Sequence, residues 1–189
     1  MKKVIIVVLV IVAVVGILAG IVVGSYNGFV ERQEEVNAAK SKIGVQLQRR
    51  ADLIPNFVAT VKGYSDYEQS TLTAVTEARA SVGKAQTVSE IGEANAELDK
   101  AISVWVNAVT EAYPDLKADA QYVALQDELA GTENRIATAR KDYNDTAKEY
   151  NIKVRKFPSN IIAGMFGFEK AELFTEDEGA QSVPQVTFE

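Results

Sequence analysis

The residue types that most often carry chemistry in proteins are unevenly represented in this sequence. Cysteine and histidine are both absent, which excludes a thiol nucleophile, a disulfide, an imidazole base and a zinc-finger ligand set. The di-iron sites of helical bundles are excluded as well, because they pair glutamate with histidine. Glu68, Glu77 and Glu97 are conceivable metal ligands, but solvated helix faces explain such acids better. The sequence therefore predicts no catalytic residue, no metal site and no cofactor.

The glycines and serines add no second route to enzymatic chemistry. The glycines lie either in an N-terminal apolar run or singly in helical segments, unlike the clustered glycines of a phosphate-binding loop. No serine occurs in a nucleophile elbow. We predict that the protein is not an enzyme; a hydrolase that uses buried carboxylates is the less favoured alternative.

A polar cluster near residue 50 is the main candidate site outside the apolar segments. It comprises Arg49, Arg50, Asp52 and Asn56, which are expected at the turn between two helices. In the structural interpretation, which we favour, Asp52 caps the second helix and an arginine binds the last carbonyls of the first. In the functional interpretation the arginines bind an acidic partner through paired hydrogen bonds.

The helices that must position these residues begin with an apolar run. Residues 4–23 contain no charged or strongly polar side chain. As a helix they are about 30 Å long, which matches the hydrocarbon core of a bilayer. The run is longer than the apolar part of a typical signal peptide. We therefore predict a retained, single-pass anchor over residues 1–24 that contacts the lipid bilayer of the cell (inner) membrane.

The charges on either side of the anchor indicate its orientation. Lys2 and Lys3 precede the apolar run, so the positive-inside rule favours a cytoplasmic N-terminus and a helical domain outside the cytoplasm. Basic residues between positions 25 and 44 weaken this asymmetry, and the reverse orientation stays open.

Four glycines recur along one stripe of the anchor helix. They are spaced four residues apart, at Gly16, Gly20, Gly24 and Gly28. Small residues at this spacing allow two membrane helices to approach closely, so the stripe is a hypothetical seam for a homo-oligomer. The alternative is that the stripe is incidental, because glycine is common in membrane helices.

The chain after the anchor has the apolar spacing of helices and no strand alternation. The first helix of the soluble region, residues 26–50, is expected to continue the anchor without a break. A second helix is expected over residues 54–82, with Pro55 in its first turn and Gly83 just after its end.

Two more helices are expected before the tail. Thr87 and Glu90 have capping-box spacing for the third. Pro114 is expected to begin the fourth, which is long and ends before Pro158. The predicted fold class is all-α: an N-terminal transmembrane helix followed by an antiparallel four-helix bundle with long helices, over residues 25–157.

An apolar segment opens the C-terminal tail, which covers residues 158–189 and is expected to be partly disordered. Its large side chains lie between positions 157 and 168, where the sequence has no charge: Phe157, Ile161, Ile162, Met165, Phe166 and Phe168. In an up-down bundle this segment emerges near the bilayer, where it dips into the membrane surface or covers a partner. The alternative, which we rate slightly higher, is that it folds back over its own bundle.

The charge of the chain is concentrated at its C-terminal end. Of the formal net charge of -6, most lies after residue 168, and the bundle itself is close to neutral. This distribution argues against nucleic-acid binding driven by the protein's field.

Long motifs resemble the LemA family over nearly the whole chain. They include Gln46-Leu47-Gln48-Arg49-Arg50-Ala51-Asp52-Leu53-Ile54-Pro55-Asn56-Phe57-Val58, Glu111-Ala112-Tyr113-Pro114-Asp115-Leu116-Lys117, Tyr143-Asn144, Tyr150-Asn151 and Phe157-Pro158-Ser159-Asn160. One departure is Tyr67-Glu68, where the family often has His-Glu. The resemblance implies a membrane-anchored helical bundle of a bacterial cell envelope, and it brings no catalytic residue or cofactor.

These observations favour a non-enzymatic scaffold that binds unidentified envelope proteins or itself. The alternative is a membrane-remodelling or lipid-contacting protein that acts through residues 157–168.

Overall fold

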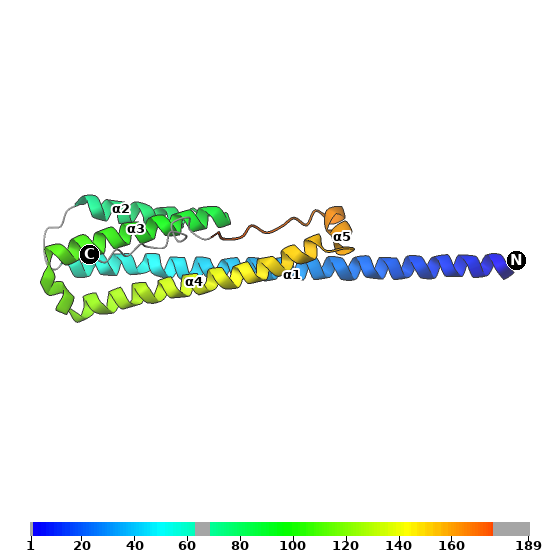
Figure 1. Ribbon diagram of the computed structural model, residues 1–189, viewed down its shortest axis with the longest axis horizontal. Helices are drawn as coiled ribbons and strands as arrows, with labels where there is room; N and C mark the ends of the chain where they lie inside the picture. Colours follow the sequence, from blue (N-terminus) through cyan, green and yellow to red (C-terminus); the bar gives the residue numbers. More distant parts are fainter. Residues whose placement is uncertain (1, 63–68, 176–189) are drawn as a thin grey trace, which may run out of the picture. The chain divides into compact units, whose positions relative to one another are not determined.

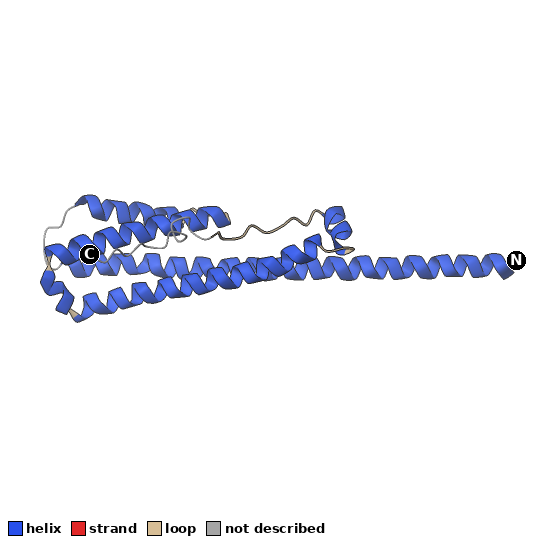
Figure 2. Cartoon of the chain, viewed as in Figure 1, coloured by secondary structure: helices blue, strands red, loops and turns tan. Residues whose placement is uncertain are grey.

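The structure of the protein is a computed structural model that describes residues 2–62 and 69–175. These residues form helices joined by turns and loops, and they contain no β-strand (Figure 2). The predicted all-α class is confirmed for this part of the chain. In chain order the elements are α1 (Lys2–Lys62), α2 (Gln69–Val82), α3 (Val88–Ala112), the 3-10 helix η1 (Pro114–Ala118), α4 (Ala120–Arg155) and α5 (Ser159–Phe166) (Figure 1).

The first helix is longer than the sequence indicated. α1 continues through Asp52 and holds Pro55 in its interior, so the expected helix boundary, with Asp52 as a cap, is wrong. In a helix interior proline removes the hydrogen bond of its own N–H group, and its ring crowds the carbonyl four residues earlier. The buried face continues across that gap, because Ala51, Ile54 and Phe57 are all buried. The expected second helix is therefore split between α1 and α2, and residues 63–68 lie outside the described residues.

Other helix ends follow local signals. Thr87 and Glu90 form the predicted capping box of α3, and α2 ends one residue before Gly83. The fourth helix was placed too early, because Pro114 begins η1. The cap of α4 is instead Asp119, whose carboxylate accepts hydrogen bonds from the N–H groups of Gln121 and Tyr122, both at 2.9 Å.

The chain divides into two compact units, and α1 and α4 contribute residues to both. Unit 1 comprises Met1–Ile43 and Lys141–Glu172; unit 2 comprises Gly44–Arg140 and Leu173–Glu189. The buried residues of α1 in unit 1 include Phe29, Val36 and Ile43. Their seven-residue spacing is typical of helices that pack side by side.

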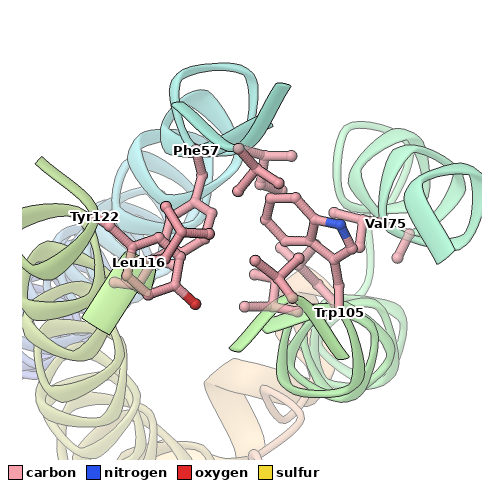
Figure 3. Close-up of a cluster of buried hydrophobic side chains, with 12 residues drawn as sticks. Phe57, Val75, Trp105, Leu116 and Tyr122 are labelled. Carbon is pink, nitrogen blue, oxygen red and sulfur yellow. The ribbon is translucent and has the colours of Figure 1, made fainter. Parts of the chain in front are cut away.

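The core of unit 2 is built from four helices and η1. The ring of Phe57 lies 5.0 Å from the ring centroids of both Trp105 and Tyr122, and Val75 and Leu116 point into the same cluster (Figure 3). All five side chains are at most 2% exposed. Burying apolar area of this kind is the main source of folding free energy.

Candidate functional site

A buried arginine of α1 is surrounded by carboxylates from two other helices of unit 2. The side chain of Arg50 is 7% exposed and forms ion pairs with Asp99 of α3 and Glu133 of α4. Asn95, one turn before Asp99, is also buried, and its amide donates to the Asp99 carboxylate at 2.8 Å. The polar cluster therefore joins α1, α3 and α4, with Arg50 and Asn95 buried and the two carboxylates partly exposed to solvent.

The cluster contains more acid than its one buried cation fully stabilises. Burial raises the pKa of Asp99 to about 6; Arg50 and Arg140 lower it, whereas Glu133 raises it by charge and by a hydrogen bond. Both carboxylates pair with Arg50. Burial, together with the charge of Glu133, thus favours the neutral form of the Asp99 carboxyl and raises its pKa above that of an ordinary aspartate.

Several polar atoms of the cluster have no hydrogen-bond partner among the described residues. They are Arg50 Nε, Asn95 Oδ1, and Nε and Nη2 of Arg140. The Arg140 guanidinium lies over the ring of Phe174, 5.3 Å from its centroid. Buried groups of this kind bind ordered water when space allows.

The four residues of the predicted cluster near position 50 are not brought into one site. Only Arg50 points into the interior. Arg49 lies on the surface and pairs with Glu128 at 2.6 Å. Asp52 is exposed, and its Oδ1 lies 3.6 Å from Nη2 of Arg79. Asn56 is exposed on the same helix.

The partners of Arg50 were not predicted from the sequence. A signal for them was present, because Asn95 falls between Ile91 and Leu98 on the apolar stripe of α3. A polar residue on such a stripe requires a buried partner.

The glycine stripe has two different environments. Side chains built at Gly16, Gly20 and Gly24 would meet no atom within 4 Å, whereas one at Gly28 would collide with the side chain of Lys153. The ammonium group of Lys153 lies over the ring of Phe29, 5.2 Å from its centroid. The end of the Lys153 side chain is flexible and can move aside, so the self-association seam stays a prediction for all four glycines.

The apolar segment after α4 has an inward and an outward face. α5 buries Ile162, and the rings of Phe166 and Tyr26 lie 5.0 Å apart. Phe168 stacks on Phe29 of α1, also at 5.0 Å. One face of the segment thus packs on α1, as the fold-back interpretation expected.

The opposite face of the same segment remains uncovered among the described residues. Phe157 is 75% exposed, Ile161 54% and Met165 68%. Large apolar side chains gathered in this way mark a surface that contacts lipid or protein.

The acidic side chains do not gather into a metal site in the part of the chain that the structure describes. Glu77 and Glu97 line an open groove between α2 and α3 together with Lys100. Glu68 lies outside the described residues.

Of the described helices, α1 alone is long and apolar enough to cross a membrane. The side chains from residue 2 to residue 21 are all exposed, so the protein itself does not bury them. A helix of this composition is stable in a bilayer.

Comparison with known proteins gives a consistent family. The LemA family model matches residues 39–188, which cover the helical domain and omit the apolar span. Magnetosome protein MamQ 2 of Paramagnetospirillum magneticum is 30% identical over 187 residues, which cover 86% of this chain and 68% of that protein. Magnetosome protein MamQ of Magnetospirillum gryphiswaldense is 26% identical with the same coverage. Protein LemA of Metamycoplasma hominis is 27% identical over 166 residues, 87% of this chain and 75% of that protein.

Proposed function

Because the chain belongs to the LemA family, we propose that it is a membrane-anchored, non-enzymatic scaffold that binds proteins of the bacterial cell envelope. The observation that carries this proposal is the continuity of α1, a single helix from Lys2 to Lys62. Its exposed apolar residues suit a bilayer, and its later residues belong to the packed core. A continuous helix keeps the residues at its two ends at a more defined distance than a flexible linker does.

We propose further that the helices after the span close as an antiparallel four-helix bundle over residues 25–157, between an anchor (1–24) and a tail (158–189). The shared aromatic core of α1, α3 and α4 in unit 2 supports this arrangement. The absence of cysteine and histidine, and the ion pairing of Arg50 with its carboxylates, support a binding function over catalysis.

Site-specific crosslinking in intact membranes tests the scaffold proposal. A photoreactive residue in place of Val104, which is 52% exposed on α3, is expected to capture one recurring envelope protein. The matched control is Trp105, its buried neighbour, which should capture none. If exposed positions on all the helices yield only lipid adducts, the protein-scaffold proposal is wrong.

The proposed orientation has a cytoplasmic N-terminus and a helical domain outside the cytoplasm of the cell (inner) membrane. A protease added to intact cells with a permeabilised outer layer is expected to digest the helical domain. Digestion only after cell lysis would reverse the orientation.

We expect Gly20→Leu to weaken self-association in a membrane two-hybrid assay, because the larger side chain separates two closely packed helices. Ala19→Leu is the matched control, since it adds similar bulk beside the stripe. Equal signals for the wild type and both variants would remove the glycine seam.

A second candidate function is a membrane-remodelling or lipid-contacting role through residues 157–168. It is supported by the uncovered face of Phe157, Ile161 and Met165. Flotation of protein lacking residues 1–24 with liposomes separates this role from the scaffold, which binds no lipid without its anchor.

A further inference from the structure

We propose that α5 is a second membrane contact, which lies flat at the headgroup–acyl boundary of the bilayer that holds the N-terminal span. Phe157, Ile161 and Met165 would face the acyl chains. This inference rests on the proposed anchor, and it adds a defined element, depth and lipid preference to the lipid-contacting role.

The level of α5 along α1 is the first argument. Tyr26, which contacts Phe166 of α5, lies three residues after the apolar run that ends at Val23. Three residues of helix correspond to about 4–5 Å. Along α1 the first partly shielded side chain is Val22, within the run itself. If residues 4–23 are in lipid, α5 therefore lies at the membrane surface.

The distribution of side chains around α5 is the second argument. Ile162 and Ala163 are buried, whereas Ile161 and Met165, four residues apart, share the exposed face. A helix on a water-facing surface normally presents polar residues on its outer face. The exposed face of α5 instead carries Ile161 and Met165, with Asn160 as the one exposed polar side chain of the helix. This is expected of a helix that packs on protein on one side and meets lipid at the headgroup level on the other.

The attachment of α5 is well defined, so its outer face has a fixed direction. At its start, the hydroxyl oxygen of Ser159 lies 2.7 Å from the carbonyl oxygens of both Lys153 and Lys156, which share its one hydrogen. Beyond its end, Asn151 of α4 and the backbone of Ala171 exchange two hydrogen bonds, both of 2.8 Å. The segment is thereby fixed on both sides within unit 1.

The charges that flank α5 indicate the lipid that it prefers. Between positions 153 and 170 the sequence has one acid, Glu169, and four basic side chains: Lys153, Arg155, Lys156 and Lys170. Arg155 and Lys156 are exposed. Basic residues beside an apolar helix attract anionic headgroups. We therefore expect an anionic bilayer to bind α5 more strongly than a neutral one.

The sequence allows a direct test, because a single introduced cysteine is the only site of labelling in a chain without cysteine. The full-length chain is reconstituted into vesicles of phosphatidylcholine and phosphatidylglycerol with an environment-sensitive fluorophore at Met165→Cys. Two reference probes are placed at Val14→Cys, in the span, and at Ala38→Cys, an exposed position of α1 beyond the contact with α5. Nitroxide-labelled lipid and aqueous iodide serve as opposing quenchers.

We expect lipid nitroxide to quench the probe at residue 165 several-fold more than the probe at residue 38. The quenching should be strongest for nitroxides near the headgroup and should weaken in phosphatidylcholine alone. A second probe, at Phe157→Cys, should behave in the same way.

Each other outcome has a distinct meaning. If the residue 14 probe is in lipid but the residue 165 probe is quenched only by iodide, the anchor holds and the α5 inference fails. If neither quencher reaches residue 165, protein covers it, and the lipid assignment is wrong. If the residue 14 probe is itself in water, the proposed anchor fails and the inference fails with it.

Discussion

Replacing Arg50 with alanine is expected to lower the free energy of unfolding by about 2–4 kcal/mol at neutral pH. The guanidinium is 7% exposed and forms ion pairs with Asp99 and Glu133. Alanine would leave these two carboxylates facing each other without their ion-pair partner, and only the smaller effect of Arg140 on Asp99 would remain. Because both carboxylates retain some solvent contact, we expect a loss toward the lower end of that measured for fully buried pairs.

Trp105 provides the measurement for this variant. It is the single tryptophan of the chain, and it is buried in the core of unit 2 beside Phe57. Its fluorescence during urea unfolding of the full-length protein in mild detergent therefore reports on the unit that contains Arg50.

The adjacent arginine is the matched control. Arg49 also forms an ion pair, with Glu128, but its side chain is 53% exposed. An exposed pair of this kind contributes about 0.2–1 kcal/mol, so Arg49→Ala should shift unfolding only slightly. If the two variants are equally stable and Arg50→Ala loses a binding partner instead, the arginine serves recognition.

The contrast between Arg49 and Arg50 illustrates what the sequence can predict. Both residues were identified, and the seven-residue spacing of the buried side chains of α1 continues from Ile43 to Arg50 and not to Arg49. The carboxylates that pair with Arg50 depend on the register of α1 against α3 and α4, which is a tertiary property. Asn95 and Asp99 were missed for the same reason, since their role depends on a partner that lies about 45–50 positions away in the sequence.

The capping box of α3, a signal that acts within one helical turn, was read correctly, whereas Asp52 and Pro114 were not. Thr87 and Glu90 satisfy each other's backbone groups, so the geometry is complete without the rest of the fold. Pro55 led to a wrong helix boundary for the opposite reason. Its local preference favours a helix start, but the buried face of α1 continues past it, and packing outweighs the lost hydrogen bond and the crowding of the preceding turn.

The segment after α4 was predicted in part. Its apolar composition indicated a contact surface, and the sequence left two interpretations open. The structure shows that the inward face packs on Tyr26 and Phe29, while no described residue covers the outward face. The fold-back interpretation thus describes one face, and contact with lipid or a partner stays a prediction for the other, a division that composition alone does not reveal.

Replacing Asp99 with asparagine is expected to stabilise the protein by about 1–2 kcal/mol at pH 7.5, although it removes one ion pair. The pKa of Asp99 is raised from 3.8 to about 6, chiefly by burial, so its surroundings as a whole favour the neutral carboxyl. Asparagine has nearly the shape of that neutral form, and Arg50 keeps its ion pair with Glu133. Because Asp99 is partly exposed, we expect less than the full free energy that the shift implies.

The raised pKa of Asp99 also determines how the stability difference between Asp99→Asn and the wild type depends on pH. A raised pKa means that the folded protein holds the Asp99 proton more tightly than the unfolded chain does. Stability from this group is present below about pH 4, falls as the pH rises toward 6, and is absent above that pH. The advantage of Asp99→Asn should therefore be small at pH 4.5 and should grow to its full value above pH 6.5.

Comparing the urea unfolding of the variant and the wild type at each pH isolates Asp99 from the other carboxylates, because their contributions cancel in the difference. Asp127→Asn is the control, since it removes the same charge from an exposed position of α4 and should change stability by only a few tenths of a kcal/mol. If Asp99→Asn is less stable than the wild type at pH 7.5, the attraction of Arg50 outweighs burial and the pKa of Asp99 lies below its ordinary value. Taken with Arg50→Ala, this result decides whether the buried cluster contains one acid too many or a balanced set of charges that α1, α3 and α4 require.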